Sequence, residues 1–333
     1  MRSLTVLITA GGLLTGLCLA GCKKSVHKTN SITTTSTSTG SVVVSMPPAT
    51  WQEHWFAHNK LLSRVYYNAS LALYFDNGMD TAVVWPRKQL SDAWVYIKKT
   101  YGAFGDSTRL YVVMHGIPPN ADPIENGYGG GHPSPYYDAS HDYRNTIDCG
   151  LGVVEWATPT GDPIREPVHE MGHIVASASY GAAHDVSSSI WGDSKFAEIF
   201  MYDVLMNIGR QDEAAAIYQQ LSTVQTTDPD YNINYPGVSY PGADFFMNWF
   251  YPIYNKYGKG ALLARYFNEL ATNLPHDRSD GLNLGEFVHF FSGAAGVNLS
   301  AQAKIAFGDY WNTAALQQLK EAQQDYPKVK YNY

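Results

Sequence analysis

The sequence predicts an α+β protein, because strand patterns come first along the chain and helix patterns follow. Residues 51–162 mix apolar β-rich runs with helical spacing, whereas residues 163–333 have helical spacing almost throughout. Of the 333 residues, 45% are apolar and 14% are aromatic, which is enough to bury one large core or two modest ones. We therefore expect a small mixed sheet with helices in the first part and a mostly helical second part.

Residues 1–21 have the pattern of a secretory signal. Arg2 precedes an apolar stretch that runs from Leu4 to Ala20, and the stretch ends in Leu-Ala-Gly-Cys. This ending resembles the bacterial lipobox, which implies cleavage before Cys22 and lipidation of that residue, palmitate included. A single membrane helix is the alternative, but the apolar run is short for one. We expect a lipid-anchored protein of the bacterial cell envelope, at the outer membrane or cell surface rather than the inner membrane.

Residues 22–50 have the composition of a flexible tether. Positions 25–50 include 13 Ser or Thr, and such a tract has no packed core to form. The globular part begins at Trp51 and continues to residue 333. Once the signal is removed and Cys22 is lipidated, Cys149 is the remaining cysteine, so we expect no intramolecular disulfide.

The charge balance argues against nucleic acid as a partner. The chain has 23 Lys and Arg against 30 Asp and Glu, which gives a formal net charge of −7. Nucleic-acid binding needs a basic patch, and no basic cluster occurs in this sequence. We expect a monomer that contacts its substrate and, through the lipid, a membrane.

The first part of the globular region alternates helix and strand patterns. The predicted elements are a helix over 51–64, a strand over 71–75, a helix over 87–100 and a strand over 109–114. A loop rich in Pro, Gly and Asn follows, over 117–135. Its Gly129–His132 run lacks the Gly-Lys-Ser/Thr ending of a phosphate loop, so we expect a loop beside the cleft. Residues 146–156 predict a strand at the edge of the sheet, where an extended substrate pairs with it.

Helical spacing dominates the second part of the chain. The predicted helices span 163–180, 194–208, 211–222, 243–257, 259–272, 284–291 and 312–325. The first of them starts with Asp162 as a cap before Pro163, or else one turn later with Pro167 in the first position. Its remaining positions are largely apolar or small, so we expect it to be packed inside the fold.

The most informative segment is His-Glu-x-x-His at residues 169–173. Residues four apart share one face of a helix, so the rings of His169 and His173 can meet one zinc ion. Glu170 lies beside that face, where its carboxylate can take a proton from zinc-activated water. By composition alone, such a motif arises in a chain of this length with a probability of roughly one in a hundred. Two ordinary histidines are the alternative, but buried imidazoles need partners, and a metal supplies one.

A third ligand is needed to complete the site. The position six residues after the second histidine is Ser179, which excludes the third histidine of a metzincin. Glu198 lies in the first turns of the next predicted helix, which can pack against the motif helix, and it is the predicted ligand. His184 and Asp185 in the intervening loop remain alternatives, whereas Asp193 is better suited to cap the second helix.

This pattern resembles the gluzincin metallopeptidases, in which a Glu on a following helix completes the site. The form His-Glu-x-Gly-His, with Glu198 placed 25 residues after His173, is most similar to enhancin-type (mucin-degrading) peptidases and to basic secretory proteins. The resemblance covers about residues 146–310 and implies a zincin-like fold, with the active-site helix between the two parts. Thermolysin-like gluzincins carry an Asp four residues after the ligand Glu; here that position is Tyr202, and Asp203 follows.

We predict a zinc-dependent endopeptidase that hydrolyses extracellular peptide or glycoprotein substrates, with Glu170 as the general base. Tyr240, in a loop of the second part, is the predicted donor to the transition-state oxyanion. The alternative function is that of a non-catalytic glycan- or protein-binding lipoprotein that keeps a zincin fold. Loss of Glu170 would favour that alternative, and Glu170 is present.

Two further groups of polar residues have other interpretations. A glycosidase needs a carboxylate pair such as Glu155 and Glu166, but this assignment leaves the His-Glu-x-x-His motif unexplained. His132, His141 and Asp142 are candidates for a second ion, although polar loop residues are usually solvated. We expect neither group to carry the main chemistry.

Overall fold

The computed structural model describes residues 45–105, 109–119, 121, 128–182, 184–192, 194–223, 240, 243–276 and 278–332. The signal, Cys22 and most of the tether lie outside the described residues, and so does Asp193. Val44–Tyr333 packs as one unit. Within the described ranges, every helix is too short or too polar to span a bilayer.

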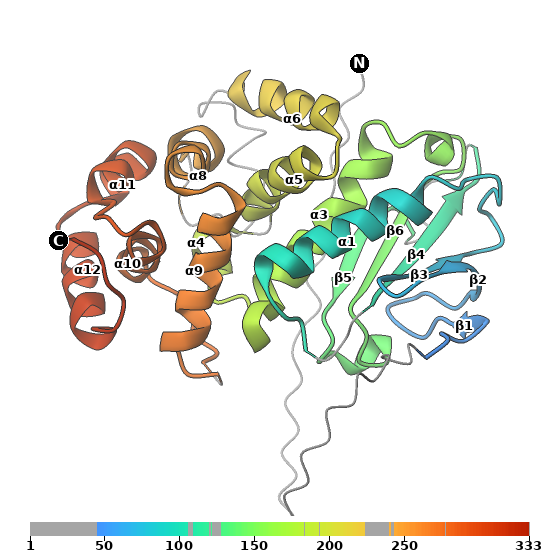
Figure 1. Ribbon diagram of the computed structural model, residues 1–333, viewed down its shortest axis with the longest axis horizontal. Helices are drawn as coiled ribbons and strands as arrows, with labels where there is room; N and C mark the ends of the chain where they lie inside the picture. The colour runs from blue at the N-terminus through green and yellow to red at the C-terminus, as the bar shows by residue number, and fades with distance from the viewer. Residues whose placement is uncertain are drawn as a thin grey trace, which may run out of the picture. The chain divides into compact units, whose positions relative to one another are not determined.

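A six-stranded mixed sheet has the strand order β1-β2-β3-β4-β6-β5 (Figure 1). Its strands are β1 (Thr50–Gln52), β2 (Leu61–Tyr67), β3 (Leu71–Phe75), β4 (Leu110–Ile117), β5 (Gly130–Ser134) and β6 (Thr146–Gly152). The central strands β3, β4 and β6 are parallel, whereas β1, β2 and β5 run antiparallel to their neighbours. The predicted small mixed sheet is therefore confirmed.

The predicted helix over 51–64 is wrong, because β1, β2 and the segment between them occupy this stretch. Trp51 and Leu62 are register partners and both are buried, whereas Leu61 is exposed. This alternation has the period of two that a strand requires. Trp51 packs edge-on against Tyr74 of β3, so contacts with a distant strand, rather than local spacing, decide the conformation.

The strand at 146–156 is also not at the edge of the sheet, contrary to the prediction. β6 ends at Gly152 and lies between β4 and β5, and β5, from the glycine-rich segment expected to be a loop, is the last strand. A Cβ atom at Gly150 would lie 1.4 Å from the Tyr128 carbonyl oxygen. Glycine at this position lets the chain entering β5 approach β6. Glycines in these two strands also interrupt the alternation of apolar residues by which a strand is recognised in a sequence.

The helical second part is confirmed. Six of the seven predicted helices occur within a few residues of their expected bounds, and the seventh, over 243–257, is divided into a π-helical turn and the short helix α8. The helices are α1 (Pro86–Tyr101), α3 (Asp162–Ala178), α4 (Ser188–Trp191), α5 (Lys195–Asn207), α6 (Gln211–Thr223), α8 (Tyr251–Tyr257), α9 (Gly260–Asn273), α10 (Leu284–Ala295), α11 (Ser300–Phe307) and α12 (Thr313–Asp325). A π-helical turn, Phe246–Phe250, precedes α8, and short 3-10 turns span 139–141, 155–157, 179–181 and 308–310. The short helices α4 and α11 were not predicted.

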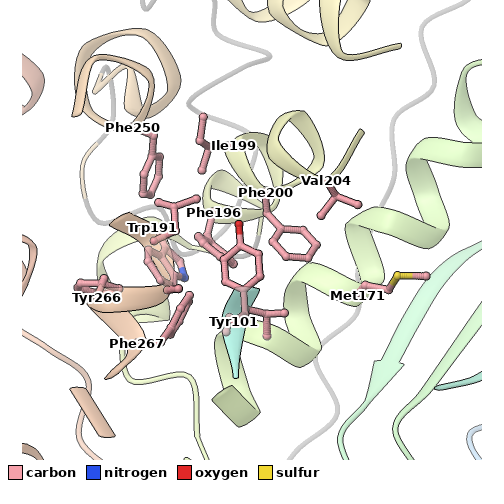
Figure 2. Packing of buried hydrophobic residues seen from close by; sticks show 14 of the residues in the cluster. Tyr101, Met171, Trp191, Phe196, Ile199, Phe200, Val204, Phe250, Tyr266 and Phe267 are labelled. Atoms are coloured by element: carbon pink, nitrogen blue, oxygen red, sulfur yellow. The ribbon is translucent and has the colours of Figure 1, made fainter. Parts of the chain in front are cut away.

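Two hydrophobic clusters lie on opposite faces of the sheet. Leu73, Met114 and Ile147 face α1 and α3 and belong to the main core, which continues into the C-terminal helices. Figure 2 shows the aromatic part of this core, where Tyr101 of α1 lies 5.3 Å from Phe200 of α5, centroid to centroid. The other face carries a smaller cluster beneath the β1–β2 connection. The sheet therefore separates two environments, one beneath the helices and one beneath that connection.

Candidate active site

Helix α3 carries the motif at the junction between the sheet and the C-terminal helices (Figure 1). It begins at Asp162 and continues through Pro167, so the earlier of the two predicted starts is adopted, but Gly161 rather than Asp162 holds the cap position. The fully buried residues Ile164, Val168 and Met171 recur at the three- and four-residue spacing of one helix face. Burial of that face against the sheet leaves the two histidines on a side that is half-buried.

The two histidines point at each other from successive turns. Their Nε2 atoms are 3.1 Å apart and their ring centroids 4.9 Å apart. Burial, and then the neighbouring His173, lowers the pKa of His169 to about 3, so its imidazole is neutral at pH 7. Two nitrogen ligands at the usual zinc distance and a tetrahedral angle are about 3.3 Å apart. The separation of the two rings therefore fits a single zinc ion, and the neutral ring of His169 is in the form that binds one.

The side chain of Glu170, from α3, lies against the edge strand β5. Only 5% of its surface is exposed, and a Cβ atom added to Gly131 of β5 would lie 2.4 Å from its Oε1. Glu170 and the two histidines form one group in which ligand-type atoms lie within 4.8 Å of one another. All three residues of the predicted motif are thus brought together, with the carboxylate against the last strand of the sheet.

Helix α5 packs closely on α3 beside this group. A Cβ atom on Gly172 would be 3.0 Å from Phe200 and 3.5 Å from the Cα of Ala197, so glycine permits the approach. Glu198 is 9% exposed, and its Oε1 lies 3.0 Å from Nζ of the buried Lys195, which sequence reasoning did not single out. The 4.8 Å group found in the described residues does not include Glu198. The packing of the two helices is as expected, and the role of Glu198 as third ligand stays a prediction.

The carboxylate after Tyr202 has a structural role. Asp203 is fully buried and accepts hydrogen bonds from three tyrosine hydroxyls, at 2.8, 2.6 and 2.7 Å. The donors are Tyr96, Tyr101 and Tyr254. Asp203 therefore ties α5 to α1 and α8 within the core, and its carboxylate is not used to orient a histidine.

The remaining predicted residues lie in other contacts. Asp185 accepts a hydrogen bond from the backbone of Ser187 at 3.0 Å and one from the indole of Trp191 at 3.2 Å, so it stabilises its own loop. Tyr240 packs its ring against Phe307 and Tyr310, and burial together with Tyr310 raises its pKa. The assignment of Tyr240 to the oxyanion stays a prediction.

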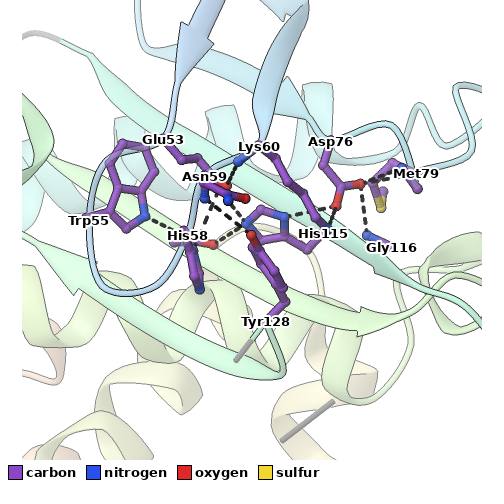
Figure 3. Close-up of polar contacts among 12 residues, drawn as sticks. Glu53, Trp55, His58, Asn59, Lys60, Asp76, Met79, His115, Gly116 and Tyr128 are labelled. Carbon is purple, nitrogen blue, oxygen red and sulfur yellow. Dashed lines mark hydrogen bonds and ion pairs between the residues drawn. The ribbon is translucent and has the colours of Figure 1, made fainter. Parts of the chain in front are cut away.

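A second group of ligand-type side chains was missed by sequence reasoning. Glu53, His58, His115 and Asp148 are all buried, with ligand atoms within 4.8 Å of one another (Figure 3). His115 and Asp148 each stand as a polar residue within an otherwise apolar strand, and that signal was available in the sequence. The loop candidates His132, His141 and Asp142 form no metal cluster among the described residues: Asp142 accepts a hydrogen bond from the Trp51 indole at 2.8 Å, and the His141 ring stacks on Trp55.

No protein-family model and no curated protein matches this sequence. Among solved structures, a mutant of the M1 zinc metallopeptidase from Deinococcus radiodurans is similar, with a TM-score of 0.45 and 10% sequence identity. The alignment covers 78% of this chain and 52% of the other, so this chain spans about half the length of that protein. At so low a TM-score the likeness supports no functional inference. The inference drawn below depends on the side chains of this chain.

Proposed function

We propose that the protein is a zinc-dependent peptidase whose active site lies between α3, α5 and the edge strand β5. One observation carries this proposal: the paired histidines and Glu170 meet at the last strand of the sheet. The Nε2 atoms of His169 and His173 are 3.1 Å apart, and Glu170 lies against Gly131 of β5. A pair of histidines suited to bind one metal ion, with a general base beside a sheet edge, suits hydrolysis of an extended chain.

The edge strand supports a peptide as the substrate. In the part of the sheet that the structure describes, β5 pairs with β6 on one side and has no strand on the other. An extended peptide can add to such an edge through backbone hydrogen bonds. Because Gly131 lies against Glu170, a peptide paired with β5 would pass beside the motif. We therefore propose that β5, rather than 146–156, receives the substrate, which is an extracellular peptide or the peptide part of a glycoprotein.

The chain's own residues divide the chemistry among them. His169 and His173 would hold the zinc, together with Glu198 as the sequence predicts. When bound, zinc acts as a Lewis acid and lowers the pKa of water towards 7. Glu170 accepts a proton from the attacking water at a carboxylate oxygen and can return it to the leaving amine. General acid–base catalysis of this kind is typically worth 10²–10⁴-fold in rate.

The direct test is a hydrolysis assay of the full chain on a mixed panel of peptides and glycoproteins. We expect cleavage that a chelator abolishes and that added zinc restores, because the histidine pair needs the ion. If the protein holds zinc and binds a panel member without cleaving it, the alternative of a glycan- or protein-binding lipoprotein replaces the peptidase. Cleavage that persists after the zinc has been removed would contradict the proposal.

We further propose that the protein is attached to a bacterial envelope membrane through Cys22. The signal pattern in residues 1–21 and the Leu-Ala-Gly-Cys ending support this proposal. Replacing Cys22 by Ser should abolish metabolic lipid labelling and release the protein from membranes. Intact-mass measurement of the wild type showing an uncleaved signal would contradict it.

A further inference from the structure

The cluster of Glu53, His58, His115 and Asp148 lies on the face of the sheet that is turned away from α3. His115 follows Met114 in β4, and Asp148 lies between Ile147 and Cys149 in β6; those apolar neighbours belong to the main core beneath the helices. Side chains alternate between the two faces of a sheet, so His115 and Asp148 point the other way. Glu53 and His58 come from the β1–β2 connection, which covers this face (Figure 3).

We propose that these four side chains bind a divalent transition-metal ion at a structural site, separate from the histidine pair on α3. His115 Nε2 lies 2.8 Å from Asp148 Oδ1 and 3.0 Å from Glu53 Oε1. His58 Nδ1 lies 3.0 Å from Asp148 Oδ2 and 3.6 Å from Glu53 Oε1. Two ligands about 2.0–2.2 Å from one tetrahedral ion are roughly 3.3–3.6 Å apart. The separations of 2.8–3.6 Å in this cluster match that spacing or are a few tenths of an ångström shorter.

Two buried atoms that lack a hydrogen bond support an ion at the centre of the cluster. Glu53 Oε1 and His115 Nε2 are both inaccessible to solvent and 3.0 Å apart. Neither atom completes a hydrogen bond of acceptable angle with any residue that the structure describes. Buried polar atoms are nearly always hydrogen-bonded, so such a pair requires an explanation. A cation bound between the two atoms, which accepts a lone pair from each, provides one.

Second partners hold the outer atoms of three ligands. The contacts are His115 Nδ1 to Asp76 Oδ2 at 3.1 Å, the Lys60 backbone N–H to Glu53 Oε2 at 2.8 Å, and the Trp55 indole N–H to Asp148 Oδ2 at 2.7 Å. A carboxylate behind a histidine is the usual arrangement for metal-binding imidazoles, because it fixes the tautomer and the direction of the ring. These contacts leave His115 Nε2, Glu53 Oε1 and Asp148 Oδ1 as the atoms available to an ion, and Asp148 Oδ2, held by the Trp55 indole, is also 3.0 Å from His58 Nδ1.

The charges of the cluster also suit a divalent ion. Three carboxylates are buried here, on Glu53, Asp76 and Asp148, and the ammonium of Lys60 pairs with Asp76. Without an ion, burial lowers the pKa of His115, but its contacts with Asp148, Asp76 and Glu53 outweigh burial and raise it to about 11, so a proton compensates part of this charge. An ion takes the place of that proton: with both histidines neutral, these groups carry a net charge of −2, which one divalent ion cancels. Uncompensated buried charge is costly, so neutrality favours occupancy.

The ligand set is closed and mixed. All four ligands are buried, and the Tyr128 ring covers them, stacking on His58 at 4.1 Å and lying 4.6 Å from His115, centroid to centroid. Four protein ligands without an open position are typical of structural zinc sites. Imidazole suits zinc, and carboxylate suits zinc or manganese. An ion here would fasten the β1–β2 connection to β4 and β6.

The test uses the full chain carrying His169→Ala together with His173→Ala, so that of the two ligand clusters among the described residues the proposed one remains. After dialysis against zinc and then against buffer, elemental analysis should give about one zinc per chain. Cobalt loaded in place of zinc should give visible ligand-field absorption, and added zinc should raise the melting temperature of this variant. In the same background, Asp148→Asn or His115→Gln should remove the ion. His132→Gln is the matched control, because His132 is the register partner of Asp148 but lies outside the cluster.

Three outcomes would overturn the proposal. A folded double variant that holds no zinc would show that the cluster is a metal-free ion network. Zinc retained after Asp148→Asn would show that the ion binds elsewhere. If Asp148→Asn and His115→Gln fail to fold, the melting curve of the double variant decides, and absence of a zinc-dependent shift overturns the site. None of these results depends on peptide hydrolysis, so the peptidase proposal stands or fails separately.

Discussion

The two faces of one sheet carry two groups built from the same residue types, histidine and carboxylate, and the groups differ in how far the protein encloses them. On α3 the two histidines are half-buried and one carboxylate accompanies them. Beneath the β1–β2 connection, two histidines and two carboxylates are all buried. A catalytic metal needs a vacant position for water and substrate, whereas a structural metal is surrounded by protein ligands. Enclosure, rather than residue type, therefore separates a site suited to catalysis from one suited to fastening the fold.

The largest expected effect on hydrolysis comes from removing a zinc ligand of the half-buried group on α3. His169→Ala should lose one equivalent of zinc and lower peptide hydrolysis by roughly 10³-fold or more, because the metal contributes several kcal/mol to the transition state. His54→Gln, outside β5 and outside both ligand clusters, serves as the control and should leave both unchanged. Zinc content and initial rates measured on the same preparations check the prediction. Unchanged zinc in His169→Ala would remove the basis for the comparison.

Glu198→Gln sharpens the definition of the open site. An amide is a poor zinc ligand, so we expect zinc and hydrolysis to fall together. The change also weakens the pair with buried Lys195, which should lower the free energy of unfolding by about 1–3 kcal/mol. Lys195→Met separates the two roles, because it removes the pair but keeps the carboxylate. If Glu198→Gln retains full zinc and full activity, the third ligand lies elsewhere.

Gly131→Ala tests the contact between the edge strand and Glu170. The added Cβ would lie 2.4 Å from Glu170 Oε1, so the carboxylate must move. A displacement of about 1 Å at a catalytic group can cost roughly 10²-fold in rate, and the zinc should remain. Gly152→Ala is the control, because its Cβ would meet only the flexible Glu155 side chain, at 3.1 Å. Equal rates for the two variants would show that the position of Glu170 does not depend on β5.

The smallest effect on catalysis is expected from a substitution in the buried cluster beneath the β1–β2 connection. Asp148→Asn in the otherwise unchanged chain should lower the melting temperature by several degrees, because about 1–3 kcal/mol is lost when a buried charged network is broken. Peptide hydrolysis below the melting temperature should stay within about threefold. A loss of activity as large as that of Gly131→Ala would show that the two faces are coupled.

The parts of the fold that follow local rules could be predicted from the sequence. Apolar residues at three- and four-residue spacing predict α3. Ser179 excludes the third histidine of a metzincin, and the spacing of Glu198 favours a glutamate as third ligand. The motif residues converge as expected because four-residue spacing on a helix guarantees a shared face. Local periodicity was sufficient wherever one helix set the arrangement.

The differences between the predicted and the observed elements arise from contacts between residues far apart in the sequence. Trp51 and Leu62 form strands because they pack on Tyr74, a contact that spacing within 51–64 does not reveal. β5 consists largely of glycine, His and Pro, so its identity depends on pairing with β6. The buried cluster could not be predicted because Glu53 and His58 come from the segment 51–64, which was expected to be helical. His115 and Asp148 alone did not indicate which partners would meet them.

The most direct test of the central claim is Glu170→Gln, with zinc content and peptide hydrolysis measured on one sample beside the wild type. Glu170 is placed as the proton acceptor rather than as a ligand, so the amide should keep the zinc and the fold while hydrolysis falls by 10²–10⁴-fold. Loss of zinc in this variant would show that Glu170 is a ligand. Hydrolysis at the wild-type rate with zinc retained would contradict the assignment of Glu170 as the general base and, with it, the proposed mechanism.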